Sequence, residues 1–134
     1  MSEKTTKIEI TSRTEALAAT QRAGDLARRI GLSEADQSKV QIAVSELANN
    51  ILDHAQGKGN MAIDAVTKRG RVGIIVIAED KGPGIINIDR ALHKPNSATG
   101  LGIGLGAVQR LMSEFRIERV NNLGIRVTAV KWKI

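Results

Sequence analysis

The stretch VGIIVIAEDKGPGI, residues 72–85, joins a long apolar run to a glycine-rich turn, and the rest of the chain can be placed around it. Residues 72–78 are apolar almost throughout, which is typical of a strand in the middle of a sheet rather than at its edge. Residues 61–67 form a second strand-like run, and Arg69-Gly70 between the two runs predicts a hairpin. The sequence therefore predicts a central hairpin whose inner strand leads into a loop carrying Asp80.

Two helices are expected before this hairpin. A Ser-x-x-Glu capping box at residues 12–15 opens the first, whose apolar residues recur at helical spacing as far as Ile30. Ser33 gives the N-terminal signal of the second helix, which should end by Gly57. A short alternating strand at residues 7–10 precedes both helices.

The second half of the chain begins with a long loop. Residues 80–104 lack a regular pattern, apart from one possible helical turn at residues 88–92, and loops of this length in small domains are usually functional. A third helix is expected to follow, with its apolar face at Leu105, Val108, Leu111, Met112 and Phe115. Residues 116–121 and 125–132 then predict a closing hairpin.

The expected order of elements is βααββ, long loop, αββ. Because the helices are clustered, we predict an α/β fold, a two-layer sandwich with a mixed sheet and helices on one face. A chain of 134 residues has room for one core, so residues 1–134 are expected to form a single domain.

Composition excludes several classes of protein. Hydrophobic residues make up 42% and charged residues 25%, the balance of a soluble globular protein. Phe115 and Trp132 are the only aromatic residues, so base stacking on aromatic platforms is unavailable, and cysteine is absent. The net charge of +6 is spread along the chain, which favours a solvated basic surface over a nucleic-acid face. With no apolar run long enough for a bilayer, we expect a cytoplasmic protein with no nucleic-acid or membrane partner.

The first chemical motif is SELANN, residues 45–50, on the expected second helix. Glu46 and Asn50 are four residues apart and therefore project from the same face. A carboxylate can accept a proton from a water or a hydroxyl, and an amide oxygen can bind Mg²⁺. In isolation such a pair is common on solvated helices.

The second motif is DKGPGI, residues 80–85. Glycine and proline alone would predict a tight turn, but a turn does not explain Asp80 at the end of a buried strand. A carboxylate only accepts hydrogen bonds, so it could take the exocyclic amine of adenine and reject guanine. Gly82 and Gly84 would let the backbone approach the ring closely.

The third motif is GLGIGLG, residues 100–106, directly before the third helix. Backbone amides at Gly100, Gly102 and Gly104 could bind phosphate with the help of the helix dipole, although a flexible hinge is the simpler explanation. The spacing is not that of a Rossmann or Walker motif, and the chain has no protein-kinase HRD or DFG sequence.

Taken in order, the three motifs resemble the N, G1 and G2 boxes of the GHKL ATPase and kinase superfamily. Within it, the chain is most similar to the serine-kinase switch proteins of the bacterial stressosome, through SELANNI, IAEDKGPGI, GLGIGLGAVQRLMSEF and AVKW. These segments span nearly the whole chain.

The resemblance implies a Bergerat ATP-binding fold with ATP and Mg²⁺ as cofactors. In that fold Glu46 would be the general base, Asn50 would bind Mg²⁺ and Asp80 would bind adenine. The loops around base and phosphates would be shaped by Gly82, Gly84, Gly100, Gly102 and Gly104. Residues 85–99 would form a short ATP lid.

Two features depart from the family pattern, and a third position, His54, has an open role. Ile125 stands where relatives often carry a threonine near the adenine, and the Pro-Asn-Ser-Ala run at residues 95–98 has no clear counterpart. His54 occurs in some relatives, yet a lone histidine on a helix is more often structural than catalytic.

The resemblance also implies partners. Its substrates would be STAS-domain scaffold proteins phosphorylated on serine or threonine, and its release would activate a PP2C-type phosphatase. Two alternatives stay open: an anti-sigma factor of the same superfamily, and a module that binds ATP without transferring phosphate.

Overall fold

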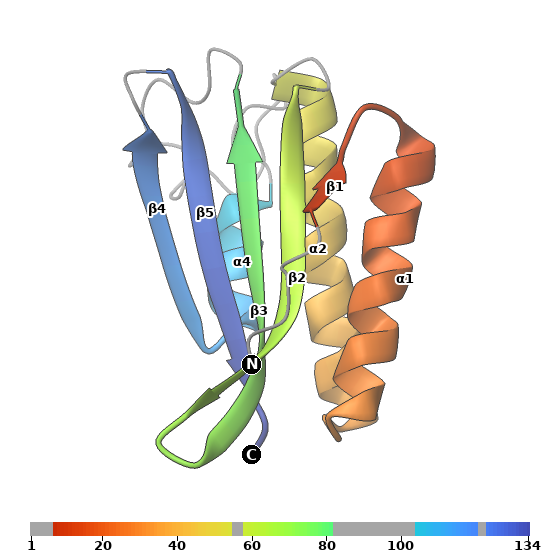
Figure 1. Cartoon of the computed structure of the whole chain (residues 1–134), viewed down its shortest axis with the longest axis vertical. Helices are drawn as coiled ribbons and strands as arrows, with labels where there is room; N and C mark the ends of the chain where they lie inside the picture. The colour runs from red at the N-terminus through yellow and green to blue at the C-terminus, as the bar shows by residue number, and fades with distance from the viewer. Residues whose placement is uncertain (1–6, 55–57, 82–103, 121–122) are drawn as a thin grey trace.

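One sheet, with the strand order β1-β2-β3-β5-β4, forms the first layer of the protein in its computed structural model. The structure describes residues 7–54, 58–81, 104–120 and 123–134. Its elements, in chain order, are β1 (Lys7–Glu9), α1 (Arg13–Arg29), α2 (Glu34–His54), β2 (Gly59–Lys68), β3 (Arg71–Asp80), α4 (Leu105–Leu111), β4 (Glu114–Val120) and β5 (Leu123–Trp132). The helices α1, α2 and α4 cover one face of the sheet, as predicted (Figure 1).

Strands β2 and β3 form the hairpin that was predicted across Arg69 and Gly70. Lys68 pairs with Arg71, and both residues of the turn have positive φ, 53° at Arg69 and 79° at Gly70. Two residues of positive φ make the type I′ turn that matches the twist of the strands on either side. Because β3 also pairs with β5, it is an interior strand, as its composition indicates.

The predicted mixture of parallel and antiparallel strands is wrong. All strand pairs in the described part of the chain are antiparallel. The connection through α4 does return the chain so that β4 runs in the same direction as β3, but β5 folds back from β4 and lies between the two. The helix-containing crossover therefore produces no parallel pairing.

The core lies between the sheet and the helices and is built from Ala, Val, Ile, Leu and Met side chains. From α2 it takes Val40, Ala43, Val44, Leu47, Ala48 and Ile51, and from β2 and β3 it takes Met61, Ile63, Ile74 and Val76. The buried positions of α1 are all alanine or glycine, which lets α1 pack closely on α2. At Gly24 the side chain of Gln41 fills the space that a Cβ would occupy.

The third helix is shorter than predicted. It ends at Leu111, because Met112 has an extended backbone with φ −100° and ψ 160°, and the Nζ of Lys131 donates a hydrogen bond of 2.7 Å to the Leu111 carbonyl. Phe115, expected on this helix, lies instead in β4 opposite Ala129. Its side chain still packs against the core, so the apolar position was right and the element was wrong.

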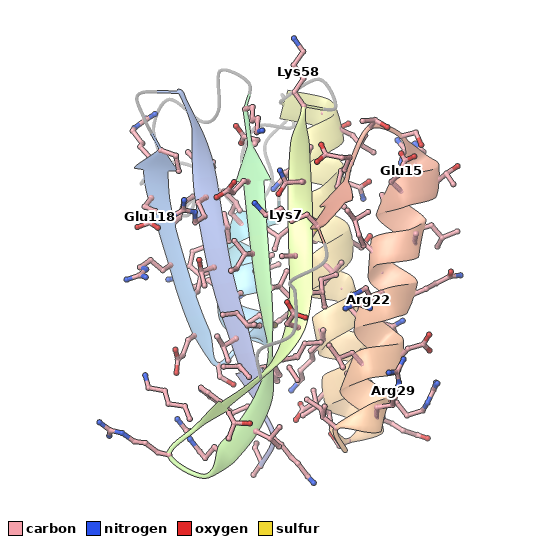
Figure 2. The ribbon with its side chains drawn as sticks, in the orientation of Figure 1. Lys7, Glu15, Arg22, Arg29, Lys58 and Glu118 are labelled. Atoms are coloured by element: carbon pink, nitrogen blue, oxygen red, sulfur yellow. The ribbon has the colours of Figure 1, made fainter. Side chains whose placement is uncertain are left out.

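Both ends of α1 are stabilised by their own side chains. Ser12 is the N-cap and accepts a hydrogen bond of 3.2 Å from the Thr14 N–H. Glu15 in the first turn accepts hydrogen bonds from the Ser12 and Thr11 hydroxyls, and these bonds hold the pKa of its carboxyl below the ordinary value. Arg28 and Arg29 lie in the last turn, where positive charge interacts favourably with the helix dipole. Figure 2 shows Glu15 and Arg29 at opposite ends of α1.

On the open face of the sheet, Arg126 of β5 joins its two neighbouring strands. It donates to Glu79 of β3 at 2.7 Å and to Glu118 of β4 at 3.1 Å. The Glu79 carboxylate, followed by that of Glu118, raises the pKa of Arg126. All three side chains are partly exposed, so this network contributes little to stability compared with the core.

Trp132 is the last residue of β5 and connects that strand to its two neighbours. It pairs with Gly73 of β3, and its indole Nε1 donates a hydrogen bond of 2.7 Å to Glu114 of β4. The guanidinium of Arg71 lies 4.5 Å from the ring centroid, within the range of a cation–π contact. One side chain thus contacts both strands that flank β5.

Candidate functional site

The end of α2 and the end of β3 meet at a pocket. From α2 the pocket is lined by Leu47, Asn50 and Ile51; from the sheet it is lined by Ala78, Asp80, Ile125 and Val127; and α4 contributes Leu105. Asn50 and Asp80 are its only polar lining residues within the described segments. An apolar pocket with a few polar groups is the usual character of a small-molecule site.

The amide of Asn50 is incompletely satisfied. Its Nδ2 is buried and has no hydrogen-bond partner among the residues that the structure describes. A buried polar group without a partner costs about 1–3 kcal/mol, so this atom favours a bound group that completes its hydrogen bonding. A phosphate oxygen could accept from Nδ2 while the neighbouring amide oxygen binds a cation.

Asp80 is the last residue of β3, and its Oδ1 is buried. Ile125 lines the same pocket and is 5% exposed. It supplies an apolar side chain at the position where the family pattern predicts a threonine. The flat, apolar face of an adenine ring suits this lining, and a buried carboxylate oxygen suits the exocyclic amine at its edge.

Gly124 explains why β5 can approach Asp80 so closely. Its φ is +54°, and a Cβ at this position would overlap the Asp80 carbonyl oxygen and lie 3.0 Å from Asp80 Oδ1. A residue with a side chain would therefore push β5 away from the pocket wall. In the sequence Gly124 falls between the two strands of the expected closing hairpin, and nothing local to it indicates contact with Asp80.

The third motif meets the first motif at Gly104. This residue is the N-cap of α4 with φ +91°, and a Cβ placed on it would overlap the Glu46 carboxylate. The absence of a side chain at Gly104 thus lets α4 begin beside Glu46. Two segments about sixty residues apart in the sequence supply a carboxylate and a helix start to one place.

The remaining predicted site residues are not described. Gly82, Gly84, Gly100 and Gly102 lie outside the described residues, as do the lid at residues 85–99 and the expected helical turn at residues 88–92. His54 is the last residue of α2, one turn beyond Asn50, and its side chain is outside the described set.

Sequence reasoning also missed the apolar wall of the pocket. Leu105 was expected on the apolar face of the third helix, Leu47 and Ile51 fall within the expected second helix, and Ala78 and Val127 fall within expected strands. Periodicity shows that a residue is buried, but not whether it is buried under another element or under a ligand.

The described residues fit a magnesium ion that is bound mainly by phosphate. Mg²⁺ usually takes one or two protein oxygens and completes its shell with waters and phosphates. Among the described residues no group of three or more His, Cys, Asp or Glu side chains could hold a metal ion by itself. The Asn50 amide, with its unsatisfied nitrogen in the pocket, is a suitable single ligand.

Among the helices of the described residues, none has the length and apolar character of a membrane span.

The chain is similar to known proteins in sequence and in fold. The model of the histidine kinase-like ATPase domain matches residues 10–131. Serine/threonine-protein kinase RsbT of Bacillus subtilis (strain 168) is 40% identical over 126 residues, which cover 93% of this chain and 94% of RsbT. The crystal structure of full-length ShkA in complex with AMPPNP aligns with a TM-score of 0.53 at 18% identity, over 98% of this chain and 31% of ShkA. The last likeness concerns the fold alone.

Proposed function

The chain belongs to the histidine kinase-like ATPase family and is a protein kinase, and we propose that it transfers phosphate from Mg²⁺-bound ATP to a serine or threonine of STAS-domain proteins. The observation that carries the proposal is the convergence of the three motifs. Asn50 and Asp80 line one pocket, and the start of α4 lies against Glu46.

Each residue has a role in this proposal. Asp80 accepts from the adenine amine, while Ile125 and the other apolar side chains cover the ring. Asn50 holds Mg²⁺, which would neutralise charge on the triphosphate. Glu46 draws the proton from the incoming hydroxyl, and most of the rate enhancement comes from positioning. The glycines 82, 84, 100 and 102 are proposed to shape the loops around base and phosphates, with residues 85–99 as a lid and His54 as an accessory position.

The identity to RsbT supports a kinase over the anti-sigma factor and over a module that only binds ATP. STAS-domain substrates and a PP2C-type phosphatase activated on release are proposed from the resemblance of the four segments to the stressosome switch kinases. Action as one domain over residues 1–134 and a cytoplasmic location are proposed from the length and composition of the chain.

Incubation with γ-labelled ATP, Mg²⁺ and a purified STAS-domain protein tests the reaction. We expect label on a serine or threonine of the STAS-domain protein, and none when Mg²⁺ is chelated. Recovery of a sigma factor in a pull-down, without transfer to any STAS-domain protein, would favour the anti-sigma factor instead.

The variant Glu46→Gln tests the base. It keeps the size of the side chain but cannot accept the proton, so transfer should fall by about 10²–10⁴-fold while ATP binding persists. Glu34→Gln, an exposed position on the same helix, is the matched control and should retain full transfer. Unchanged transfer in Glu46→Gln would refute the assignment of the base.

A further inference from the structure

A groove that the nucleotide pocket does not use runs along the α1–α2 pair. It encloses about 200 Å³ and is lined by Arg13, Ala16, Leu17 and Thr20 of α1 and by Ser45 and Asn49 of α2. The two helices pack closely through the alanine and glycine positions of α1, and Gln41 Nε2 adds a long hydrogen bond of 3.4 Å to the Thr20 carbonyl. The groove is therefore a feature of two firmly packed helices.

Two large apolar side chains are exposed at this groove, Leu17 in its lining and Ile42 three residues before Ser45 on α2. Leu17 is 58% exposed and Ile42 is 48% exposed; within the described segments the other large hydrophobic side chain exposed to this extent is the C-terminal Ile134. Single exposed leucines need no explanation, but Leu17 lines the groove from α1, and Ile42 shares the face of α2 that carries the lining residues Ser45 and Asn49, so the two side chains add apolar surface to one region.

The α2 residues that line the groove share one face of that helix with the candidate base Glu46. Ile42, Ser45, Glu46 and Asn49 are spaced i, i+3, i+4 and i+7, so they share one face of α2. Glu46 lies on the side of this face that meets α4, since its carboxylate contacts the Gly104 position, and Ser45 and Asn49 lie on the side that meets α1. A protein seated in the groove would thus extend over α2 to Glu46.

We propose that this groove, with Leu17 in its lining and Ile42 beside it, docks the phospho-acceptor protein and so presents its hydroxyl to Glu46; this inference rests on the proposed kinase function. The complementary surface would carry an apolar side chain to contact Leu17 and Ile42, and a carboxylate to face exposed Arg13. An acidic acceptor also suits a chain with a net charge of +6, since opposite charges speed association.

Substitution of the exposed residues tests the docking site without touching the core. Leu17→Asp and Ile42→Asp should each raise the KM for the STAS-domain acceptor about tenfold or more. We expect kcat to change less than twofold and the Kd of an ATP analogue, measured by calorimetry, to stay unchanged. An unchanged KM, or a KM that rises only together with the Kd of the analogue, would overturn the proposal.

Two controls separate docking from general effects of a new charge. Ala18→Asp places the same carboxylate on the exposed surface of α1, about 100° around the helix from Leu17, and Ile134→Asp removes an exposed apolar residue far along the chain. Both should retain the KM of the unmodified chain. If either control raises the KM as much as Leu17→Asp does, the groove has no special role.

A binding measurement distinguishes failure of docking from failure of the kinase function. The chain, loaded with Mg²⁺ and a non-hydrolysable ATP analogue, is titrated with the same STAS-domain protein. Binding that Leu17→Asp weakens, without any phosphate transfer by the unmodified chain, would support the groove and refute the kinase function. Absence of both binding and transfer would overturn both proposals.

The competing occupant of the groove is a second copy of this chain. Sedimentation of the unmodified protein and of Leu17→Asp detects it. A dimer that dissociates in the variant, with the KM for the acceptor unchanged, would overturn the proposal in favour of self-association.

Discussion

Gly70 and Gly124 both have positive φ, but only Gly124 lies against another residue. Replacing each by alanine therefore separates the stability lost to an unfavourable backbone conformation from the stability lost to a steric overlap. Gly70 has φ +79° and nothing within 4 Å of the place of a Cβ, whereas at Gly124 a Cβ would overlap Asp80. Gly70→Ala should therefore lower the free energy of unfolding by about 1–2 kcal/mol, from conformation alone.

Gly124→Ala should cost about 1–3 kcal/mol more than Gly70→Ala, because strand β5 must also move. It should weaken ATP binding as well, while Gly70→Ala leaves binding unchanged. Urea unfolding and calorimetry measure the two effects. Equal losses of stability in the two variants would show that the approach of Gly124 to Asp80 is not tightly constrained.

Asp80→Asn tests the recognition of the base. An amide can turn its N–H₂ toward the guanine oxygen, which a carboxylate cannot do. We expect the Kd for ATP to rise about tenfold or more and the preference for ATP over GTP to narrow. Competition binding with the two nucleotides measures both quantities, and an unaltered preference would remove Asp80 from the adenine site.

The sequence could predict that Asn50 and Asp80 belong to one site, because their motifs come in a recognisable order. It could not predict the contacts at Gly104 and Gly124. Each of these glycines faces a residue distant along the chain, and a glycine in a loop has the same local pattern whether it faces solvent or a carboxylate.

For the helices, the first turn of α1 gives a pH-dependent test. The hydroxyls of Ser12 and then Thr11 lower the pKa of Glu15, so the carboxylate stabilises the fold above the pKa of the unfolded chain, about 4.3. This stabilisation should be lost as the pH falls through the lower pKa of the folded state. Glu15→Gln should therefore be less stable than the unmodified chain at neutral pH, and the difference should vanish in strong acid.

Chemical unfolding at a series of pH values measures this difference. Glu9→Gln, which changes an exposed carboxylate on β1, serves as the control. A stability difference for Glu15→Gln that does not change with pH would contradict the hydrogen-bonding arrangement at the N-terminus of α1.

Helices and strands were predictable where the spacing of apolar residues stayed regular over several helical turns or a whole strand. The two long helices and the β2–β3 hairpin are examples. The third helix was overextended because Phe115 fits a helical period from Leu105, yet with Ile117 it also fits the alternation of a strand. The end of α4 depends on Lys131, which binds the Leu111 carbonyl from a distant strand and is invisible to a local pattern.

At the level of the whole molecule, the pocket spans α2, α4, β3 and β5, so a nucleotide bound there should stabilise the entire fold. At a ligand concentration one hundred times the Kd, the stabilisation is about 2.7 kcal/mol. For a domain of this size it should raise Tm by roughly 10 °C. Thermal unfolding with and without Mg-ATP measures the shift.

Asp80→Asn at the same nucleotide concentration should show a much smaller shift in Tm. No shift in the unmodified chain, with either ATP or ADP, would contradict the assignment of the pocket as the nucleotide site.

The position of Trp132 has a consequence for how the folding of this chain can be timed. It is the only tryptophan, and it is buried where β5 meets residues far earlier in the chain. Contacts that join distant segments form slowly, because the intervening chain must first be brought together. During folding, the change in its fluorescence therefore reports when β5 joins the sheet. Far-UV circular dichroism follows the formation of the helices independently.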